Sequence, residues 1–221
     1  MKFFRLLCFS ACFALVGCQV TPPRIDPYSG LLAANTRPTS SSMKPAKADL
    51  SAQTVYVVVG ANYVTYADAW NKMTERGRNP LAYMLVPGGK DLLEFAAASW
   101  SPERTNSIVI DMLKKHFKEV RVVDDFGAAR KLGASWIVMY DHAYVQTSTA
   151  TASWTNVTTI DLLTRDLQKA IGVEVTESSA YGAAWGPDDS HRFSKLRGED
   201  IVKTITAASR QFDQKLTAIA Q

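Results

Sequence analysis

Cysteine is nearly absent from this chain. Its three cysteines, Cys8, Cys12 and Cys18, all lie within the first 18 of 221 residues. The rest of the chain therefore has no thiol, which excludes disulfides, cysteine nucleophiles and cysteine-ligated zinc from residues 19–221. A thiol-free body also tolerates an oxidising compartment such as the periplasm.

Strong charge and long apolar runs are lacking as well. The chain has 25 basic and 21 acidic side chains, which gives a formal net charge of +4. Nucleic-acid binding usually needs a strongly basic face, so we expect no nucleic-acid partner. After residue 18 no apolar run approaches the roughly 20 residues that span a bilayer, so we expect no internal membrane span.

Motifs for metal binding and phosphate binding are missing too. The histidines, His116, His142 and His191, lie far apart, and none has a second ligand at metal-site spacing. Asp141 and His142 are neighbours on a predicted strand, so their side chains point to opposite faces. The segment Pro87-Gly88-Gly89-Lys90 lacks the spacing of a phosphate-binding loop and is interpreted as a turn.

Two sets of residues have the side chains used in catalysis, but their spacing does not favour an active site. Asp188-Asp189-Ser190-His191 has the residue types of a hydrolytic triad, but in one tetrapeptide and without a nucleophile elbow. Four dispersed carboxylates could converge as in glycosidases, although nothing in their spacing favours it; they are Asp68, Glu94, Asp141 and Asp161. We therefore predict that the protein is not an enzyme and holds neither a cofactor nor a metal.

The N-terminus, in contrast, carries a clear signal. Lys2 and Arg5 precede an apolar stretch, Leu6 to Val16, which has the length of a signal-peptide core and is too short to span a bilayer well. It ends in Leu15-Val16-Gly17-Cys18, which resembles the lipobox of bacterial lipoproteins. The resemblance implies cleavage before Cys18 and acylation of that residue, for example with palmitate. The alternative is an ordinary secretory signal that happens to contain a cysteine.

The residue after the cysteine bears on the choice of membrane. Gln19 follows Cys18. In Gram-negative lipoproteins an Asp at that position tends to retain the protein in the inner membrane, and Gln does not. The resemblance therefore implies an anchor in the inner leaflet of the outer membrane, with the body in the periplasm. Two or three acyl chains hold a protein durably, because each buried methylene contributes about 0.8 kcal/mol.

The chain divides into a signal peptide (1–17), a lipidated flexible tether (18–50) and a single domain (51–221). Five prolines and Ser40-Ser41-Ser42 interrupt residues 19–50, and large apolar residues are few there. Such a composition does not bury enough surface to offset the ordering entropy. A coil of its roughly 32 residues has a dimension of about 30 Å. The alternative is that Ile25 to Leu32 packs against the body.

From residue 51 onward the pattern predicts an α+β domain of two layers. Residues 54–59 are apolar and β-branched, as in a strand buried on both faces. Residues 154–165 and 170–179 alternate and predict a long β-hairpin, with a helix over 162–171 as the alternative. Other strands are predicted at 81–86, 119–123 and 134–146, and helices at 61–75, 102–117, 126–132 and 201–219. Helices on one face of a mixed sheet, after a disordered N-terminal tether, satisfy this order.

This order of elements resembles small α/β domains of bacterial envelope lipoproteins and secretion accessories. Examples are the N-terminal domain of TolB, the periplasmic part of CsgG and auxiliary lipoproteins of ABC-type transport systems. Residues 54–59, 108–117, 120–123 and 133–138 carry the likeness. The turn at Arg165-Asp166 departs from it, because it lacks the glycine usual in the polar hairpin of such domains.

Three surface features are candidate binding sites. Trp100, Trp154 and Trp185 lie near loops or strand ends, where their rings could stack on sugars or on a partner, with core packing as the alternative. Residues 191–197 alternate basic and apolar side chains and could attract acidic headgroups or an acidic partner, unless they form a solvated lead-in to the last helix; the basic residues are Arg192, Lys195 and Arg197. Thr147 to Thr159 would suit edge pairing with another chain.

Taken together, these features predict a non-catalytic outer-membrane lipoprotein. We expect it to act as an accessory in envelope transport, secretion or surface assembly, anchored in the membrane and docked on a larger envelope protein complex. The alternatives are a lipoprotein that binds glycans of peptidoglycan or lipopolysaccharide, and a periplasmic hydrolase with a dispersed site.

Overall fold

A mixed β-sheet forms the centre of the molecule. The computed structural model describes residues 23–32, 37–40, 49–77, 94, 97–148, 153–182 and 187–220. The strands are β1 (Thr39–Ser40), β2 (Thr54–Val59), β3 (Glu119–Val123), β4 (Trp136–Ser148), β5 (Ser153–Thr164) and β6 (Gln168–Ala180), and they lie in the order β1-β6-β5-β4-β2-β3. β2 pairs parallel with β3 and β4, whereas β4, β5 and β6 pair antiparallel. The predicted α+β class with a mixed sheet is confirmed.

β2 follows a short 3-10 helix, η1 (Leu50–Ala52), and is buried on both faces, as its sequence predicts. Val55 and Val57 point into the core between the sheet and the long helices. Tyr56 and Val58 point into a second, smaller core on the other face. This alternation explains the continuous apolar run, because a strand covered on both sides needs apolar residues at every position.

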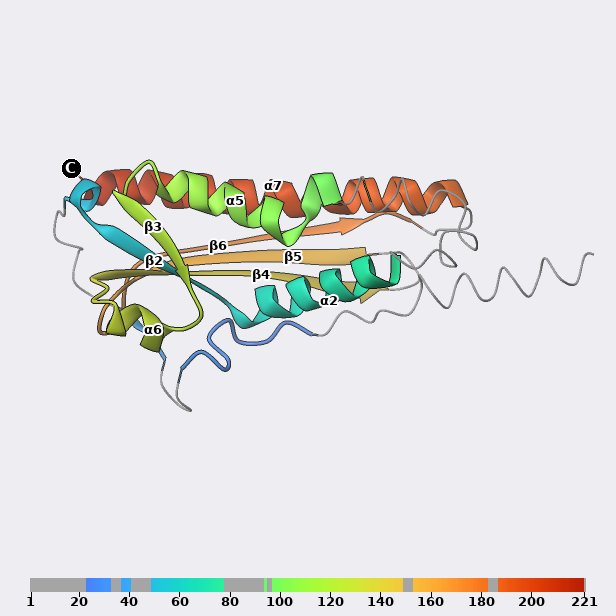
Figure 1. Cartoon of the computed structure of the whole chain (residues 1–221). Helices are drawn as coiled ribbons and strands as arrows, with labels where there is room; N and C mark the ends of the chain where they lie inside the picture. Colours follow the sequence, from blue (N-terminus) through green and yellow to red (C-terminus); the bar gives the residue numbers. More distant parts are fainter. Residues whose placement is uncertain are drawn as a thin grey trace, which may run out of the picture.

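Two long helices, α5 (Pro102–Leu113) and α7 (Pro187–Ile219), cover one face of the sheet (Figure 1). α5 begins as predicted: the Ser101 hydroxyl accepts a hydrogen bond from the Arg104 backbone N–H at 3.3 Å, and Pro102 occupies the first turn. The apolar positions of α7 that face the sheet are all buried; they are Ile201, Ile205, Ala208, Phe212, Leu216 and Ile219.

The other face is covered by smaller pieces. The short helix α6 (Phe126–Lys131) places Phe126 and Ala129 in the second core, and Tyr28, Leu31 and Leu32 pack against the same core. The prediction of helices on one face of the sheet therefore holds for α5 and α7. It does not hold for α6, which lies on the opposite side (Figure 1).

The helix α2 (Ala61–Gly77) lies beside the part of β4 that extends past β2. The pairing of β2 with β4 ends where Val59 meets Tyr140, and the chain then turns into α2. The buried carboxylate of Asp141 caps this helix, accepting from the Tyr63 backbone N–H at 2.9 Å. Gly60 is required there, because a Cβ would lie 2.4 Å from Asp141 Oδ1.

The β5–β6 hairpin is confirmed, and the alternative of a helix over residues 162–171 is wrong. Its tight connection uses Leu167 at φ 60°, a left-handed conformation that usually calls for glycine. The Leu167 side chain is 4% exposed and packs in the second core. Burial of this side chain offsets the cost of the left-handed backbone and explains why the turn lacks glycine.

Two pieces of the predicted tether pack against the sheet. Residues 24–32, which we call the strap, cross the face opposite α5 and α7 (Figure 1). Thr39 and Ser40 form β1 and pair with Gln168 and Lys169 of β6. The alternative in which residues 25–32 pack against the body is therefore the one that the contacts support, and the predicted domain boundary at residue 51 is too late.

The remaining sequence predictions concern a sheet edge, residues 81–90 and membrane spans. β5 lies between β4 and β6, so the described residues 153–159 do not offer a sheet edge for pairing with another chain. Residues 81–86 and the segment Pro87 to Lys90 lie outside the described residues. No helix in the described part of the chain is both long and apolar enough to cross a bilayer.

Candidate functional site

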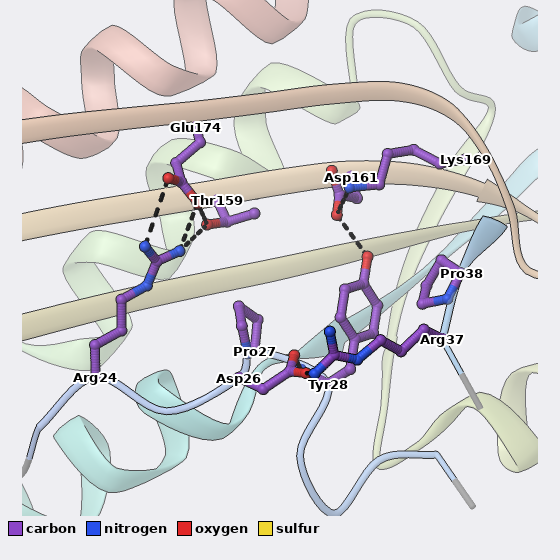
Figure 2. A pocket seen from close by; sticks show the side chains of 10 residues that line it. All are labelled: Arg24, Asp26, Pro27, Tyr28, Arg37, Pro38, Thr159, Asp161, Lys169 and Glu174. Carbon is purple, nitrogen blue, oxygen red and sulfur yellow. Dashed lines mark hydrogen bonds and ion pairs between the residues drawn. The ribbon is translucent and has the colours of Figure 1, made fainter. Parts of the chain in front are cut away.

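A polar cleft of about 260 Å³ lies between the strap and the sheet (Figure 2). Its walls come from the strap, from the residues just before β1, and from β5 and β6. The lining residues are Arg24, Asp26, Pro27, Tyr28, Arg37, Pro38, Thr159, Asp161, Lys169 and Glu174.

Strand alternation sets which side chains enter the cleft. In β5, Ile160 and Leu162 face the long helices, so Thr159 and Asp161 face the strap. Gly172 of β6 lies opposite Asp161 in the register. It leaves the space the carboxylate needs, since a Cβ there would lie 2.8 Å from Asp161 Oδ1.

Asp161 is the buried centre of the cleft. Its side chain is 1% exposed, and Oδ2 accepts from the Tyr28 hydroxyl at 2.5 Å and pairs with Lys169 Nζ at 2.7 Å. A buried carboxylate is costly without such partners. Burial, and then the charge of Asp161, raise the pKa of Tyr28 well above its usual range, so the phenol remains a donor. The other oxygen, Oδ1, is buried without a partner among the described residues.

The outer part of the cleft is held by ion pairs. Arg24 Nη2 lies 2.5 Å from Glu174 Oε2, and Thr159 Oγ1 also donates to this oxygen at 3.2 Å. The hydrogen bond from Arg24 keeps the pKa of Glu174 below its usual range. Arg37 and Asp26 form a more exposed pair at 2.8 Å. The acids and bases of the cleft thus neutralise one another, and the arrangement fastens the strap to the sheet.

A second cluster lies on the helix side of the sheet, around Arg197. Its guanidinium carbon lies 4.0 Å from the ring centroid of Tyr144, 4.9 Å from that of Trp100 and 5.1 Å from that of Trp154. We call these four residues the aromatic cage. Tyr144 and Trp154 also stack on each other, with centroids 4.5 Å apart.

The cage brings together three of the six predicted binding residues. Trp100 is 4% exposed and Trp154 is half-buried, so the core-packing alternative describes them better than a free stacking platform. Sequence reasoning missed Tyr144. Its signal is the alternation of Tyr140, His142 and Tyr144, which places all three on one face of β4.

The remaining candidates do not join the cage. Arg192 is exposed, and Lys195 is exposed with its Nζ 4.0 Å from Glu199. Both lie on α7, which begins at Pro187 rather than near Ile201. Cys18 and Trp185 lie outside the described residues.

Among the candidate catalytic residues, Asp141 and Asp161 lie at diagonal positions of the β4–β5 register on the strap side of the sheet, whereas His142 points to the other side. His142 is fully buried, with Nδ1 2.9 Å from Thr158 Oγ1, and burial lowers the pKa of His142 to about 3. Asp141 points to the other face, as predicted, and burial raises its pKa. His116 pairs with Asp213 at 2.6 Å. Asp68 is exposed on α2, and the side chain of His191 is not among those described. No group of His, Cys, Asp and Glu in the described ranges could hold a metal ion.

Comparison with known proteins gives little more than weak structural likenesses. Neither a protein-family model nor a curated protein sequence matches this chain. Three solved structures to which the chain is similar are the following. A PelC dodecamer from Paraburkholderia phytofirmans is 14% identical, with a TM-score of 0.35, over 74% of this chain and 93% of that chain. A Xanthomonas campestris protein of the DUF330 family is 10% identical, with a TM-score of 0.38, over 83% and 94%. A predicted lipoprotein from Caulobacter crescentus is 13% identical, with a TM-score of 0.28, over 61% and 85%.

These TM-scores all lie below 0.5, so the likenesses carry no argument about what this chain does. The resemblance of the body to TolB, CsgG and transport auxiliary lipoproteins stays a prediction from the sequence.

Proposed function

We propose that this chain is an envelope lipoprotein, acylated at Cys18 and anchored in the inner leaflet of the outer membrane. The lipobox Leu15-Val16-Gly17-Cys18 is the single observation that carries the proposal. The absence of cysteine from residue 19 onward supports it, because the thiol of Cys18 then has no partner for a disulfide.

The body is a non-catalytic accessory of an envelope complex for transport, secretion or surface assembly. Two features of the described residues support this role. In the cleft, the acidic and basic groups pair with one another, and Asp161 is occupied by Tyr28 and Lys169. On the helix side, Trp100 and Trp154 pack on Arg197, which favours core packing over glycan stacking for these two rings.

Acylation is tested by mass spectrometry of the chain purified from membranes. We expect a mature N-terminus at Cys18 that carries acyl chains. Cys18→Ser removes the acceptor thiol, so we expect its product to carry no acyl chain in the same measurement. Cys8→Ser is the matched control and leaves acylation unchanged, since the signal peptide is cleaved. An unmodified Cys18 in the mature protein would contradict the proposal.

The accessory role is tested by crosslinking in intact cells. We expect the wild-type chain to crosslink to one defined envelope complex. The Cys18→Ser chain should lose most of this product, because it no longer shares the membrane surface with its partner. If wild-type and variant give the same diffuse pattern, the chain has no specific partner and the accessory role fails.

A further inference from the structure

The strap fixes how far the body can lie from its anchor. Arg24 follows Cys18 by six residues in the sequence. A fully extended chain spans at most about 3.3–3.6 Å per residue, so this link reaches no more than about 20 Å. A free tether of roughly 32 residues would have a dimension of about 30 Å and could extend to about 110 Å.

The contacts of the strap with the sheet mean that the link from Cys18 to Arg24, rather than a free tether of roughly 32 residues, limits the distance to the anchor. Ile25 exchanges two hydrogen bonds with the side chain of Asn62, its N–H and its carbonyl each at 2.9 Å. Arg24 pairs with Glu174, and Tyr28 binds Asp161. The ring of Tyr28 also stacks on Phe126 with centroids 6.1 Å apart. Leu31 and Leu32 at the far end of the strap pack on the second core, so polar and apolar contacts along its length hold it on the sheet.

The strap also determines which face is nearest the anchor. It crosses the face of the sheet opposite α5 and α7. Helices pack about 10 Å from the layer beneath them and are about 10–12 Å wide, so the outer surface of α7 lies roughly 15–20 Å beyond the sheet. A link of at most about 20 Å does not reach round the sheet and place α7 against the membrane.

We infer that the docked strap holds the face formed by the strap and α6 against the lipid surface, with α5 and α7 directed into the periplasm. Two of the four exposed large hydrophobic residues in the described part of the chain lie on this face, Ile25 and Leu132. The short link, rather than net charge, sets the orientation. The partner of this face is thus the bilayer, and the inference rests on acylation at Cys18.

The orientation is testable with single thiol labels, because the mature chain has no cysteine besides Cys18. Leu132→Cys places a fluorophore on the strap face, and Gln214→Cys places one on exposed α7. The acylated full-length chain is reconstituted in phosphatidylethanolamine–phosphatidylglycerol vesicles that carry a nitroxide on the lipid headgroup. We expect quenching at position 132 to be at least about twofold stronger than at position 214.

A strap-release variant isolates the cause. Arg24→Ala with Tyr28→Ala removes the ion pair and the half-buried ring, so the link lengthens and the difference between the two labels disappears. Ser29→Ala, at an exposed strap position, is the matched control and retains the difference. Circular dichroism confirms that the body of each variant remains folded.

The outcomes separate the two claims. If Cys18 carries no acyl chain and the protein does not bind the vesicles, the proposed function itself fails. If the acylated protein binds and both labels are quenched equally, or label 214 more strongly, the lipoprotein assignment stands and the orientation is overturned. Stronger quenching at 132 that persists in the strap-release variant would show that the strap is not its cause.

Discussion

Arg197 is a cation enclosed largely by aromatic rings. The ring centroids of Tyr144, Trp100 and Trp154 lie 4.0–5.1 Å from its guanidinium carbon, and its Nε is buried without a partner among the described residues. A desolvated cation over ring faces gains about 2 kcal/mol or more from the ring quadrupoles. The side chain thereby joins the first half of α7 to β4 and β5.

Replacement of Arg197 tests that role. We expect Arg197→Ala to lower the free energy of unfolding by about 1–3 kcal/mol, through lost cation–π contacts and lost packing of the stem. Arg210→Ala, at an exposed position of the same helix, should change it by less than about 0.5 kcal/mol. Urea unfolding followed by circular dichroism measures both. Equal effects would mean that the cage contributes nothing specific.

His142 predicts a pH dependence of stability. Its folded pKa is lowered to about 3 by burial, below an unfolded value of about 6.5. The unfolded chain therefore binds the proton first, so this contribution is complete above pH 6.5 and is lost as the pH falls towards 3. The steepest slope is about 1.4 kcal/mol per pH unit.

Comparison with His142→Gln isolates this contribution. The raised pKa of Asp141 changes stability with pH in the opposite direction to His142, but it does so equally in both proteins and cancels in the comparison. We expect the variant to be less stable than wild type at pH 7 but to lose less stability between pH 6.5 and pH 4. Urea unfolding at a series of pH values gives both slopes. Parallel curves would show that His142 takes up its proton without unfolding.

At the scale of elements, α7 packs unusually close to Trp100. A Cβ on Gly198 would lie 2.4 Å from Trp100 Cδ1. Glycine inside a helix ordinarily costs about 0.5–1 kcal/mol relative to alanine. Here the close approach outweighs that preference, because overpacking a fixed ring costs about 1–3 kcal/mol.

Gly198→Ala should therefore destabilise the protein by about 1–2 kcal/mol, against the usual direction for a helix. Thr206→Ala, at an exposed position of the same helix, should stabilise it by a few tenths of a kcal/mol. Thermal and urea unfolding of the two variants decide between propensity and packing. A gain in stability for Gly198→Ala would show that Trp100 moves aside at little cost.

The regular elements were largely predictable because their signals are local. Each signal lies within a single element: the apolar run in β2, the capped start in α5 and the apolar periodicity in α7. The β5–β6 connection was harder to predict, since Leu167 takes a glycine-like conformation that only its buried side chain explains.

At the scale of the whole molecule, the strap and the long helices divide the body into two faces of different character. The strap face holds the cleft, with Asp161 at its centre, and carries the link towards Cys18. The helix face holds the aromatic cage and the outer surface of α7. In the proposed arrangement the first face meets lipid, and the second is the surface available to an envelope partner.

The lipobox-like segment, the thiol-free body and the α+β class can be read from the order of the residues, because signals, composition and periodicity are properties of neighbouring residues. The contacts of Arg24 with Glu174, of Tyr28 with Asp161 and of Arg197 with the cage join residues far apart in the chain, so they became visible only in the folded protein. The composition of residues 19–50 predicted a tether, because a count of apolar residues does not show which of them pack against the sheet. A few well-placed side chains, such as Tyr28 and Leu32, suffice to dock the strap once the sheet has formed the surface that receives them.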